Sequence, residues 1–307
     1  MCSEQIGKNT VDQSIEQSLD QLDVVIINYN AGQALRAAVD SVLACEKIKT
    51  RCVIVDNASN DDSLAFLESY PSSEVLLLRN TENYGFAVAV NQAAVAVQTE
   101  FFLLLNPDAV VTDSALFALL RAGQEDPTAG VLSCLVINSD GSEQRGCRRD
   151  LPTPLLTLAH GFRLHKLFPG LEFNHTNRAL PEKIVSVPAL SGACMLIRHA
   201  AHQDIGGFDE QFFLHFEDLD YCARLPIAGW QVLFVPYASI QHQQGVSSAS
   251  RPMRVEFYKA RSMQRFLWKH GGKQKIIVPF LVPLIALRAL SHIAFLCYQR
   301  LSRLLKA

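Results

Sequence analysis

The feature that most constrains the fold is an alternation of short apolar runs with amphipathic stretches through the first half of the chain. Each apolar run is too short for a helix and has polar residues at its ends, which is typical of buried strands. These runs cover residues 22–27, 52–55, 75–78, 101–105 and 131–135. Amphipathic stretches near 32–44, 61–69, 85–97 and 114–122 predict the intervening helices. This alternation predicts an α/β fold, with a mainly parallel central sheet flanked by helices.

Polar residues follow the predicted strands where each strand ends. In open parallel sheets the ligand crevice lies at the carboxyl ends of the strands, so these side chains predict one shared site. Asn30 and Asn60 also precede helical stretches and are predicted N-caps. The polar strand ends are Asn28 and Asn30, Asp56 and Asn57, Asn80 to Asn83, and Asn106 with Asp108.

Two common phosphate-binding motifs are missing from the sequence. The first predicted strand has no GxGxxG after it, and GxxxxGK[ST] occurs nowhere. These absences disfavour a dinucleotide oxidoreductase and a P-loop NTPase. The candidate chemistry therefore lies in carboxylates and carboxamides.

Two acids at strand ends are candidate donor-site residues. Asp56 could accept an N–H from uracil, thymine or guanine, whereas cytosine offers no such donor; the alternative is an Asp that caps the next helix. Asp108, in Asn106-Pro107-Asp108, is a hard oxygen ligand suited to Mg²⁺ or Mn²⁺ beside a diphosphate. The alternative for this segment is an ordinary turn.

Further along the chain, Glu217, Asp218 and Asp220 follow a very apolar approach. A partly desolvated carboxylate has a raised pKa, which suits a general base for an acceptor hydroxyl. Alternatively, acids at the start of a helix complement its dipole. His242 follows a predicted strand at 231–235 and is one of nine histidines, and a lone histidine is more often packed than a ligand.

The N-terminus, the middle segment and the cysteines add further expectations about the organisation of the chain. Residues 1–20 have no basic-then-apolar layout, so we expect a flexible terminus and no cleaved leader. Residues 138–185 contain four prolines and a basic group at Arg145, Arg148 and Arg149, which predicts a loop-rich insertion. A strand is expected at 194–197 and a helix from Glu217. The eight scattered cysteines, without a CxxC pair, indicate reduced thiols in the cytosol.

The end of the chain is strongly basic. From Arg251 onward there are twelve Lys or Arg and a single acid, Glu256. An apolar stretch at 276–287 contains two prolines and is followed by Arg288, and a charge at the centre of a spanning helix costs about 2.5–3.5 kcal/mol. We therefore expect a basic amphipathic helix lying on an anionic membrane surface, the alternative being a helix packed on the domain or in a homodimer. Its predicted polar face comprises Arg288, Ser291, His292, Gln299, Ser302, Arg303 and Lys306.

Taken together, the motifs resemble the family 2 glycosyltransferases, and within them the rhamnosyltransferase-like branch, over about residues 22–270. The resemblance implies a GT-A fold, an inverting mechanism and a divalent metal, Mg²⁺ or Mn²⁺. It is carried by the segments Asp23–Asn30, Val55–Asp61, Asn83–Ala87, Leu105–Asp108, Ser191–Arg198, Gly206–Glu210 and Phe213–Asp220.

Residue by residue, the resemblance implies a donor site, a metal site and a catalytic acid. Asp56 would contact the nucleobase of the donor, and Asp108 and His242 would hold the metal and the diphosphate. Asp218 would be the general base for catalysis, with Glu217 beside it. Two departures stand out: Asn106 replaces an acid, and Pro226 falls inside the helix that should follow Glu217. The implied donor-binding residues are Asn28, Asn30, Asp56, Asn57, Asn83, Gly85, Phe86, Asn106 and Asp108.

The resulting prediction is an inverting transferase of rhamnose or a similar hexose, acting in cell-surface polysaccharide synthesis. Its donor would be dTDP-rhamnose or a UDP-sugar, its acceptor a lipid-linked or other glycan, and nucleic acid is not an expected partner. The catalytic domain would span 21–250, with a donor half to about 135 and an acceptor half from about 186. The tail at 251–307 would attach the protein peripherally to the cytoplasmic face of the membrane.

Two alternatives stay open at this point. A nucleotidyltransferase that makes the sugar nucleotide would need a cationic, Gly-rich phosphate loop, and Asn30-Ala31-Gly32-Gln33 has no cation. A non-catalytic sugar-nucleotide-binding module is conceivable because of Asn106 and Pro226.

Overall fold

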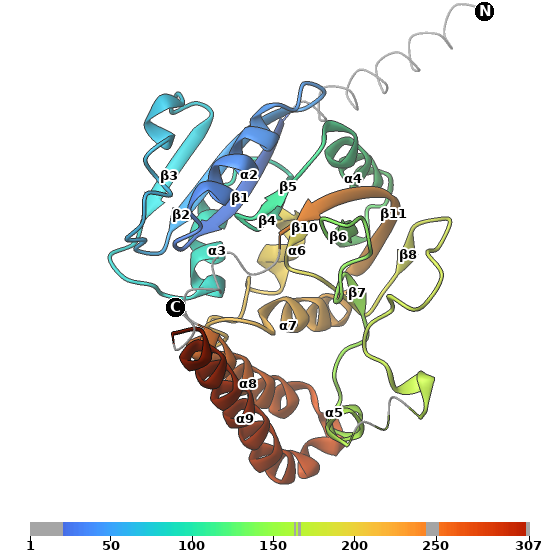
Figure 1. Cartoon of the computed structure of the whole chain (residues 1–307). Coiled ribbons are helices and arrows are strands. Elements are labelled where there is room, and N and C mark those ends of the chain that lie inside the picture. Colours follow the sequence, from blue (N-terminus) through green and yellow to red (C-terminus); the bar gives the residue numbers. More distant parts are fainter. Residues whose placement is uncertain (1–20, 163, 165–166, 244–251, 305–307) are drawn as a thin grey trace, which may run out of the picture.

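The computed structural model describes residues 21–162, 164, 167–243 and 252–304. A nine-stranded sheet forms its centre, in the order β3-β2-β1-β4-β10-β6-β11-β5, with β8 paired to β11 (Figure 1). Its strands are β1 Gln21–Asn28, β2 Lys49–Asp56, β3 Val75–Arg79, β4 Phe101–Leu105, β5 Ala109–Val110, β6 Ala129–Ile137, β8 Val185–Ser186, β10 Cys194–Arg198 and β11 Gln231–His242. A separate small sheet pairs β7 (Arg148–Arg149) with β9 (Ala189–Leu190).

The sheet is mostly parallel, as predicted. Strands β3, β2, β1 and β4 run parallel to one another, and Asn28 at the end of β1 lies opposite Asp56 at the end of β2. Strand β10 is antiparallel to β4 and β6, whereas β11 is parallel to β6. The carboxyl ends of β1, β2 and β4 therefore meet at one edge.

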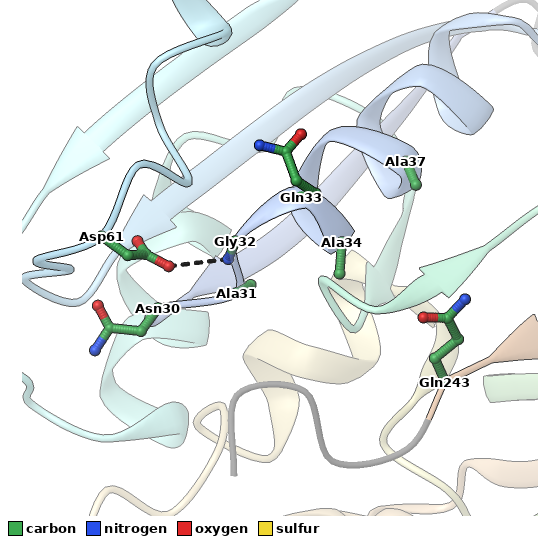
Figure 2. A pocket seen from close by; sticks show the side chains of 8 residues that line it. All are labelled: Asn30, Ala31, Gly32, Gln33, Ala34, Ala37, Asp61 and Gln243. Atoms are coloured by element: carbon green, nitrogen blue, oxygen red, sulfur yellow. Dashed lines mark hydrogen bonds between the residues drawn. The ribbon is translucent and has the colours of Figure 1, made fainter. Parts of the chain in front are cut away.

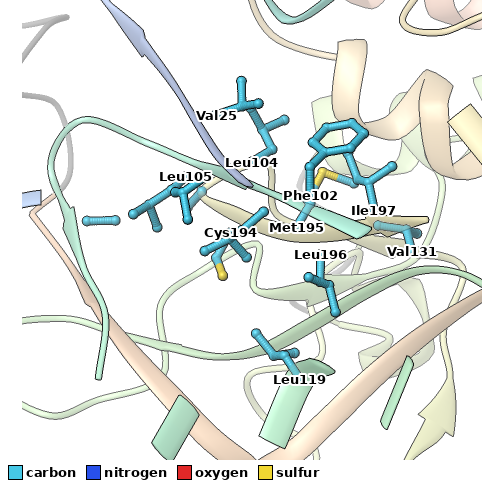
Figure 3. Packing of buried hydrophobic residues seen from close by; sticks show 14 of the residues in the cluster. Val25, Phe102, Leu104, Leu105, Leu119, Val131, Cys194, Met195, Leu196 and Ile197 are labelled. Carbon is cyan, nitrogen blue, oxygen red and sulfur yellow. The ribbon is translucent and has the colours of Figure 1, made fainter. Parts of the chain in front are cut away.

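Apolar side chains fill both faces of the central strands. All five residues of β4 and all five of β10 are buried, and Figure 3 shows Phe102, Leu104, Met195 and Ile197 packed together near Val131. A strand covered on both faces reads as an unbroken apolar run. This burial explains why the apolar runs predicted the strand positions.

Helices cover the sheet and build the end of the chain. The α-helices are α2 Gln33–Leu43, α3 Phe86–Val95, α4 Asp113–Glu125, α5 Pro154–Gly161, α6 His199–Asp204, α7 Glu217–Arg224, α8 Pro252–His270 and α9 Val278–Leu304. Helix α7 ends before Pro226, which lies in a 3₁₀ turn at Leu225–Ala228, as its lack of an N–H predicts.

The predicted helix at 61–69 is wrong. This segment forms turns and a short 3₁₀ helix at Leu67–Ser69. Asp61 Oδ1 accepts from the backbone N and the hydroxyl of Ser63, at 3.2 and 2.5 Å, and such local bonds compete with helix formation. Asn60 consequently caps no helix. Asn30 is not an N-cap either, because α2 is capped by Gly32 and Asn30 has a left-handed φ of 53°.

Helices α8 and α9 form an antiparallel hairpin against the rest of the protein (Figure 1). Phe266 of α8 belongs to the main core, and Leu267 packs with Val278, Leu281 and Ile285 near the turn. On the polar face predicted for α9, His292 Nδ1 lies 3.3 Å from Glu256 of α8. The side chains of Gln299, Ser302, Arg303 and Lys306 lie outside the described residues.

Much of α9 carries exposed apolar side chains. By length and composition, the stretch Gly272–Tyr298 could cross a membrane, with a mean hydropathy of 2.0 and 17% of its apolar window buried. One side of α9 thus packs on protein, as in the alternative considered for the tail, and the other side does not. The exposed apolar residues are Phe280, Leu284, Leu287, Leu290, Phe295 and Tyr298.

Candidate active site

A network of polar side chains links the ends of β1 and β2. The buried Asn28 donates through Nδ2 to Asp56 Oδ1 at 2.8 Å and lies 3.0 and 2.9 Å from the hydroxyls of Ser59 and Ser63. Its Oδ1 atom is buried and has no hydrogen-bond partner among the residues that the structure describes. Asn30, in the next turn, accepts from Asn60 N at 2.8 Å. Asn28 therefore offers an acceptor that a bound ligand could satisfy.

Asp56 is 4% exposed, and its carboxylate already accepts three hydrogen bonds. Oδ1 takes bonds from Asn28 and the Ser59 hydroxyl, whereas Oδ2 takes only Ser59 N at 3.1 Å. Because no α-helix follows, the interpretation of Asp56 as a helix cap is wrong. Oδ2 retains capacity for one further donor, such as a base N–H.

A second set of residues joins the carboxyl-end edge of the sheet to the loop before α7. Asn83 Oδ1 accepts from Gly85 N at 2.9 Å, and Asn57 Nδ2 donates to Gly85 O at 3.1 Å. Gly85 has a φ of 92°, and a Cβ there would lie 2.7 Å from Phe213 O. The next amide, of Phe86, donates to that same carbonyl at 2.9 Å. Only glycine fits this close approach of the two halves.

Asp108 and His242 meet in a buried pair. His242 Nε2 lies 2.9 Å from Asp108 Oδ1 and 3.2 Å from Asn106 Nδ2. On the other side of the ring, Nδ1 lies 2.6 Å from Gln144 Oε1. Gln144 Nε2 donates to the carbonyl of His242 and to Asn138 Oδ1, so Oε1 must be the atom that faces the ring. Nδ1 is therefore the protonated nitrogen.

The position of the pair would suit a metal ion shared with a substrate. His242 Nε2 and Asp108 Oδ1 lie together on the side of the ring away from Gln144, and an imidazole nitrogen with one carboxylate could hold Mn²⁺ or Mg²⁺ shared with a diphosphate. Gln144 supplies the outer hydrogen bond that metal-bound histidines commonly make. Among the described residues, no group of three or more His, Cys, Asp or Glu could hold a metal by itself. A metal ion at this pair would therefore take its other ligands from the substrate or from water.

The acids at the start of α7 have two different environments. Asp218 Oδ2 lies 2.5 Å from Arg149 Nη2 and accepts from Gly192 N at 3.2 Å, and its Oδ1 accepts from Leu219 N. Burial, and then the charge of Asp218, raise the pKa of Glu217 from 4.5 to about 8. Glu217 Oε2 is buried, and no described residue forms a hydrogen bond with it. The desolvated acid expected here is thus Glu217, protonated at neutral pH, and Asp218 is the ion-paired neighbour.

Two short segments connect Asp218 to the Asp108–His242 pair. Asn106 N donates to Ala193 O at 3.0 Å, while the neighbouring Gly192 N donates to Asp218. The loop at 144–149 also contacts both places, through Gln144 to His242 and through Arg149 to Asp218. The three residues therefore lie around one region, and Asp220 turns away to Arg224, Lys269 and His270.

Helix α8 braces the loop that leads into α7. His215 and Phe216 both have left-handed φ values, of 65° and 69°, which are strained for residues with side chains. Ser262 of α8 donates to Leu214 O at 2.9 Å, and Tyr258 stacks on Phe213 with ring centroids 4.2 Å apart. These contacts hold the strained turn from outside.

An open cavity of about 490 Å³ lies between the start of α2 and the end of β11. Figure 2 shows Asn30, Gly32 and Asp61 on one side, where Asp61 accepts from Gly32 N at 2.9 Å, and Gln243 on the other. Gln243 directly follows His242, and its amide donates to Asp108 O. The cavity is thus lined both by the turn after β1 and by the residue that follows His242.

A family model described as "Glycosyltransferase like family 2" matches residues 20–268. The chain belongs to the family 2 glycosyltransferases. This glycosyltransferase is 30% identical, over 247 residues, to the N-acetylglucosaminyl-diphospho-decaprenol L-rhamnosyltransferase of Mycobacterium tuberculosis strain CDC 1551. That similarity covers 76% of this chain and 79% of the relative.

Two solved structures show that the glycosyltransferase has the predicted GT-A fold. GalNAc-T7 with UDP, GalNAc and Mn²⁺ has a TM-score of 0.60 at 19% identity, covering 83% of this chain and 49% of its own. The mannosyltransferase PcManGT from Pyrobaculum calidifontis, with GDP-Man and Mn²⁺, has a TM-score of 0.56 at 17% identity. It is matched over 89% of this chain and 74% of its own.

Two residues of the site were not among the predicted site residues. Arg149 belongs to the basic group noted in the 138–185 segment, but the sequence gives no reason to single it out from Arg145 and Arg148. Arg148 instead forms an ion pair with Glu143, with 3.0 Å between Arg148 Nε and Glu143 Oε1. Gln144 has no signal at all in the sequence, because its role depends on a partner 98 positions away.

Proposed function

We propose that this glycosyltransferase is an inverting, metal-dependent enzyme that transfers rhamnose or a similar hexose. The donor would be dTDP-rhamnose or a UDP-sugar, and the acceptor a lipid-linked or other glycan used in cell-surface polysaccharides. The observation that carries the proposal is the position of Asp108 with His242 on one side of the 191–193 turn and Asp218 on the other. A donor diphosphate at the first pair would place its sugar toward the acid.

The polar strand ends would bind the nucleotide. The open acceptor capacity of Asp56 Oδ2 and the unsatisfied Asn28 Oδ1 suit a base that carries an N–H. Asn30 and Asn57 would complete this pocket, with Asn83, Gly85 and Phe86 toward the ribose and diphosphate. Asn106 would orient His242 through its amide.

Asp218 would act as the general base. It takes the proton of an acceptor hydroxyl, whose oxygen attacks the anomeric carbon from the face opposite the diphosphate. The bond from that carbon to the phosphate oxygen breaks, its electrons leave with the nucleoside diphosphate, and the configuration inverts. Arg149 orients the Asp218 carboxylate for this step, and protonated Glu217 avoids a second negative charge beside it. Mg²⁺ or Mn²⁺ held by Asp108 and His242 would neutralise charge on the leaving diphosphate as a Lewis acid.

The hairpin tail would hold the enzyme at the cytoplasmic membrane face. Exposed apolar residues along α9 and the excess of basic residues suit an anionic lipid surface. Flotation with vesicles containing phosphatidylglycerol should recover the protein, and loss of binding in high salt without detergent would argue for a purely electrostatic contact.

The proposal is tested by a donor screen. UDP-, dTDP-, GDP- and CDP-sugars are incubated with the enzyme, with Mn²⁺ or with EDTA, and release of the nucleoside diphosphate is measured. We expect metal-dependent turnover of a dTDP- or UDP-sugar. Preference for a CDP-sugar would contradict the role of Asp56. Full activity in EDTA would contradict the role of Asp108 and His242, and pyrophosphate release from a sugar phosphate and a nucleoside triphosphate would favour the nucleotidyltransferase alternative.

A further inference from the structure

Four cations from three separate segments lie near Asp218, the proposed general base. They are Arg145, Arg149, Lys259 and Arg288, here called the cation cluster. Arg149 forms its inner end, because its Nη2 contacts Asp218 and its Nε is buried without a hydrogen-bond partner. Arg145 lies four residues before it on the same loop and is exposed.

Helix α8 brings Lys259 to this place. The residue before it, Tyr258, stacks on Phe213, and Ser262 bonds to Leu214 O, so this turn of α8 lies on the loop that leads to Glu217 and Asp218. Lys259 and Arg149 both lower the pKa of the intervening His215, after burial as the main cause. Lys259 is therefore close to the acid and to Arg149.

Helix α9 contributes Arg288. Glu256 of α8 contacts His292 of α9 at 3.3 Å, and the two helices are antiparallel. One turn forward on α8 is Lys259, and one turn back on α9 is Arg288, so the two cations lie side by side. Desolvation lowers the pKa of Lys259, and the charges of Arg288, Arg145 and Arg149 lower it further against the opposite effect of Glu256.

The cluster carries more positive charge than its neighbours neutralise. Within the described chain, Arg145, Lys259 and Arg288 form no ion pair, and all three are exposed. The carboxylates nearby are Asp218, which pairs with Arg149, and Glu256, which contacts His292, so two carboxylates face the four cations. Like charges held together repel one another, and a bound polyanion removes that cost.

We propose that the cation cluster binds the diphosphate of a lipid-linked acceptor sugar. This inference rests on the proposed function, since the sugar next to that diphosphate would present its hydroxyl to Asp218. Arginine and lysine suit phosphate oxygens, through forked and single contacts respectively. Leu284 and Leu287, exposed on α9 within one turn of Arg288, offer a path for the lipid chain. The donor diphosphate has its own place at Asp108 and His242.

The same phosphate chemistry is present in bilayer headgroups, so the test separates the two sources. The variants are Arg145→Gln, Lys259→Gln and Arg288→Gln, with Lys273→Gln and Lys275→Gln as matched controls. The control lysines are exposed cations of the same hairpin, located at its turn. The full-length enzyme is assayed with a sugar on a short prenyl diphosphate and with the same sugar on an uncharged alkyl chain.

We expect the ratio of kcat/KM for the diphosphate acceptor to that for the uncharged acceptor to fall about ten-fold in each cluster variant. The control variants should keep the wild-type ratio. An unchanged ratio in the cluster variants would overturn the inference. Weaker flotation of the cluster variants with phosphatidylglycerol vesicles, at an unchanged ratio, would also overturn it. The cations would then bind lipid headgroups and not the acceptor diphosphate.

Failure of the proposed function gives a different result. If the wild-type enzyme turns over no sugar nucleotide at all, the transferase proposal fails, together with this inference. If the wild type uses the uncharged acceptor as well as the diphosphate acceptor, the transferase proposal stands and only the role of the cation cluster is lost.

Discussion

Arg149 Nη2 lies 2.5 Å from Asp218 Oδ2, and the same carboxylate oxygen accepts from Gly192 N. The acid is thus fixed from two sides by groups that belong to neither the donor pocket nor helix α7. Fixing a base in one orientation is what efficient proton removal from a bound hydroxyl requires.

Replacing Asp218 with Asn should remove the proposed general base while keeping its shape. We expect kcat for sugar transfer to fall about 10²–10⁴-fold, the usual contribution of a general base, with donor affinity unchanged. Steady-state transfer assays and titration calorimetry with the donor measure the two quantities. Asp140→Asn, in an exposed turn, is the matched control. A variant within three-fold of the wild-type kcat would rule out this role for Asp218.

Gln144→Ala should weaken the metal binding proposed for the Asp108–His242 pair. Loss of the bond to Nδ1 frees the ring and its tautomer, and such outer-shell changes typically cost 10–100-fold in metal affinity. The concentration of Mn²⁺ that gives half-maximal donor turnover should rise by about that factor. Ser142→Ala, an exposed neighbour on the same loop, should leave the titration curve in place. Identical curves for Gln144→Ala and the wild type would contradict the assignment.

Glu217 should make the folded state less stable as the pH rises. Its pKa is about 8 in the folded protein and 4.5 when exposed, so between these values the folded state binds more protons than the unfolded state. Stability therefore falls from about pH 4.5 to about pH 8. Thermal unfolding over this range should show a weaker slope for Glu217→Gln than for the wild type. Glu182→Gln, at an exposed position, should keep the slope, and a wild-type slope in Glu217→Gln would disprove the prediction.

Asp220 should be a major stabilising residue rather than a catalytic one. It is fully buried and contacts Arg224, Lys269 and His270, each at 2.7 Å. Burial alone would raise its pKa, but the bonds from His270, Lys269 and Arg224 lower it to about 2. This stability is present above pH 3.8 and is lost as the pH falls through about 2.

Asp220→Asn would remove the carboxylate that pairs with Arg224 and would leave Lys269 with Asp209 alone, and breaking a buried ion pair costs about 3–5 kcal/mol. Urea unfolding measures the change, with exposed Asp62→Asn as the control. A loss of stability no larger than that of the control would show that the cations do not depend on Asp220.

The sequence predicted the sheet well because its strands are buried on both faces and therefore appear as unbroken apolar runs. It failed at 61–69, where Asp61 binds Ser63 and Gly32 and the side-chain bonds prevail over the amphipathic pattern. The Asp108–His242 contact spans 134 positions, and only the family resemblance pointed to it. Gln144, Arg149 and the bracing of the 213–216 loop by α8 depend on distant contacts that no local pattern records.

The grip of α8 on the loop before α7 also bears on how the protein can be shortened. Deleting everything after about residue 250 to obtain a more soluble enzyme would remove Phe266 from the core and expose the space it fills. It would also remove Tyr258, which stacks on the ring of Phe213. It would also leave Asp209 and Asp220 without Arg265, Lys269 and His270. A cut after His270, before the apolar stretch begins, keeps every one of these contacts, so the exposed apolar helix can be removed at the hairpin turn while α8 stays on the domain.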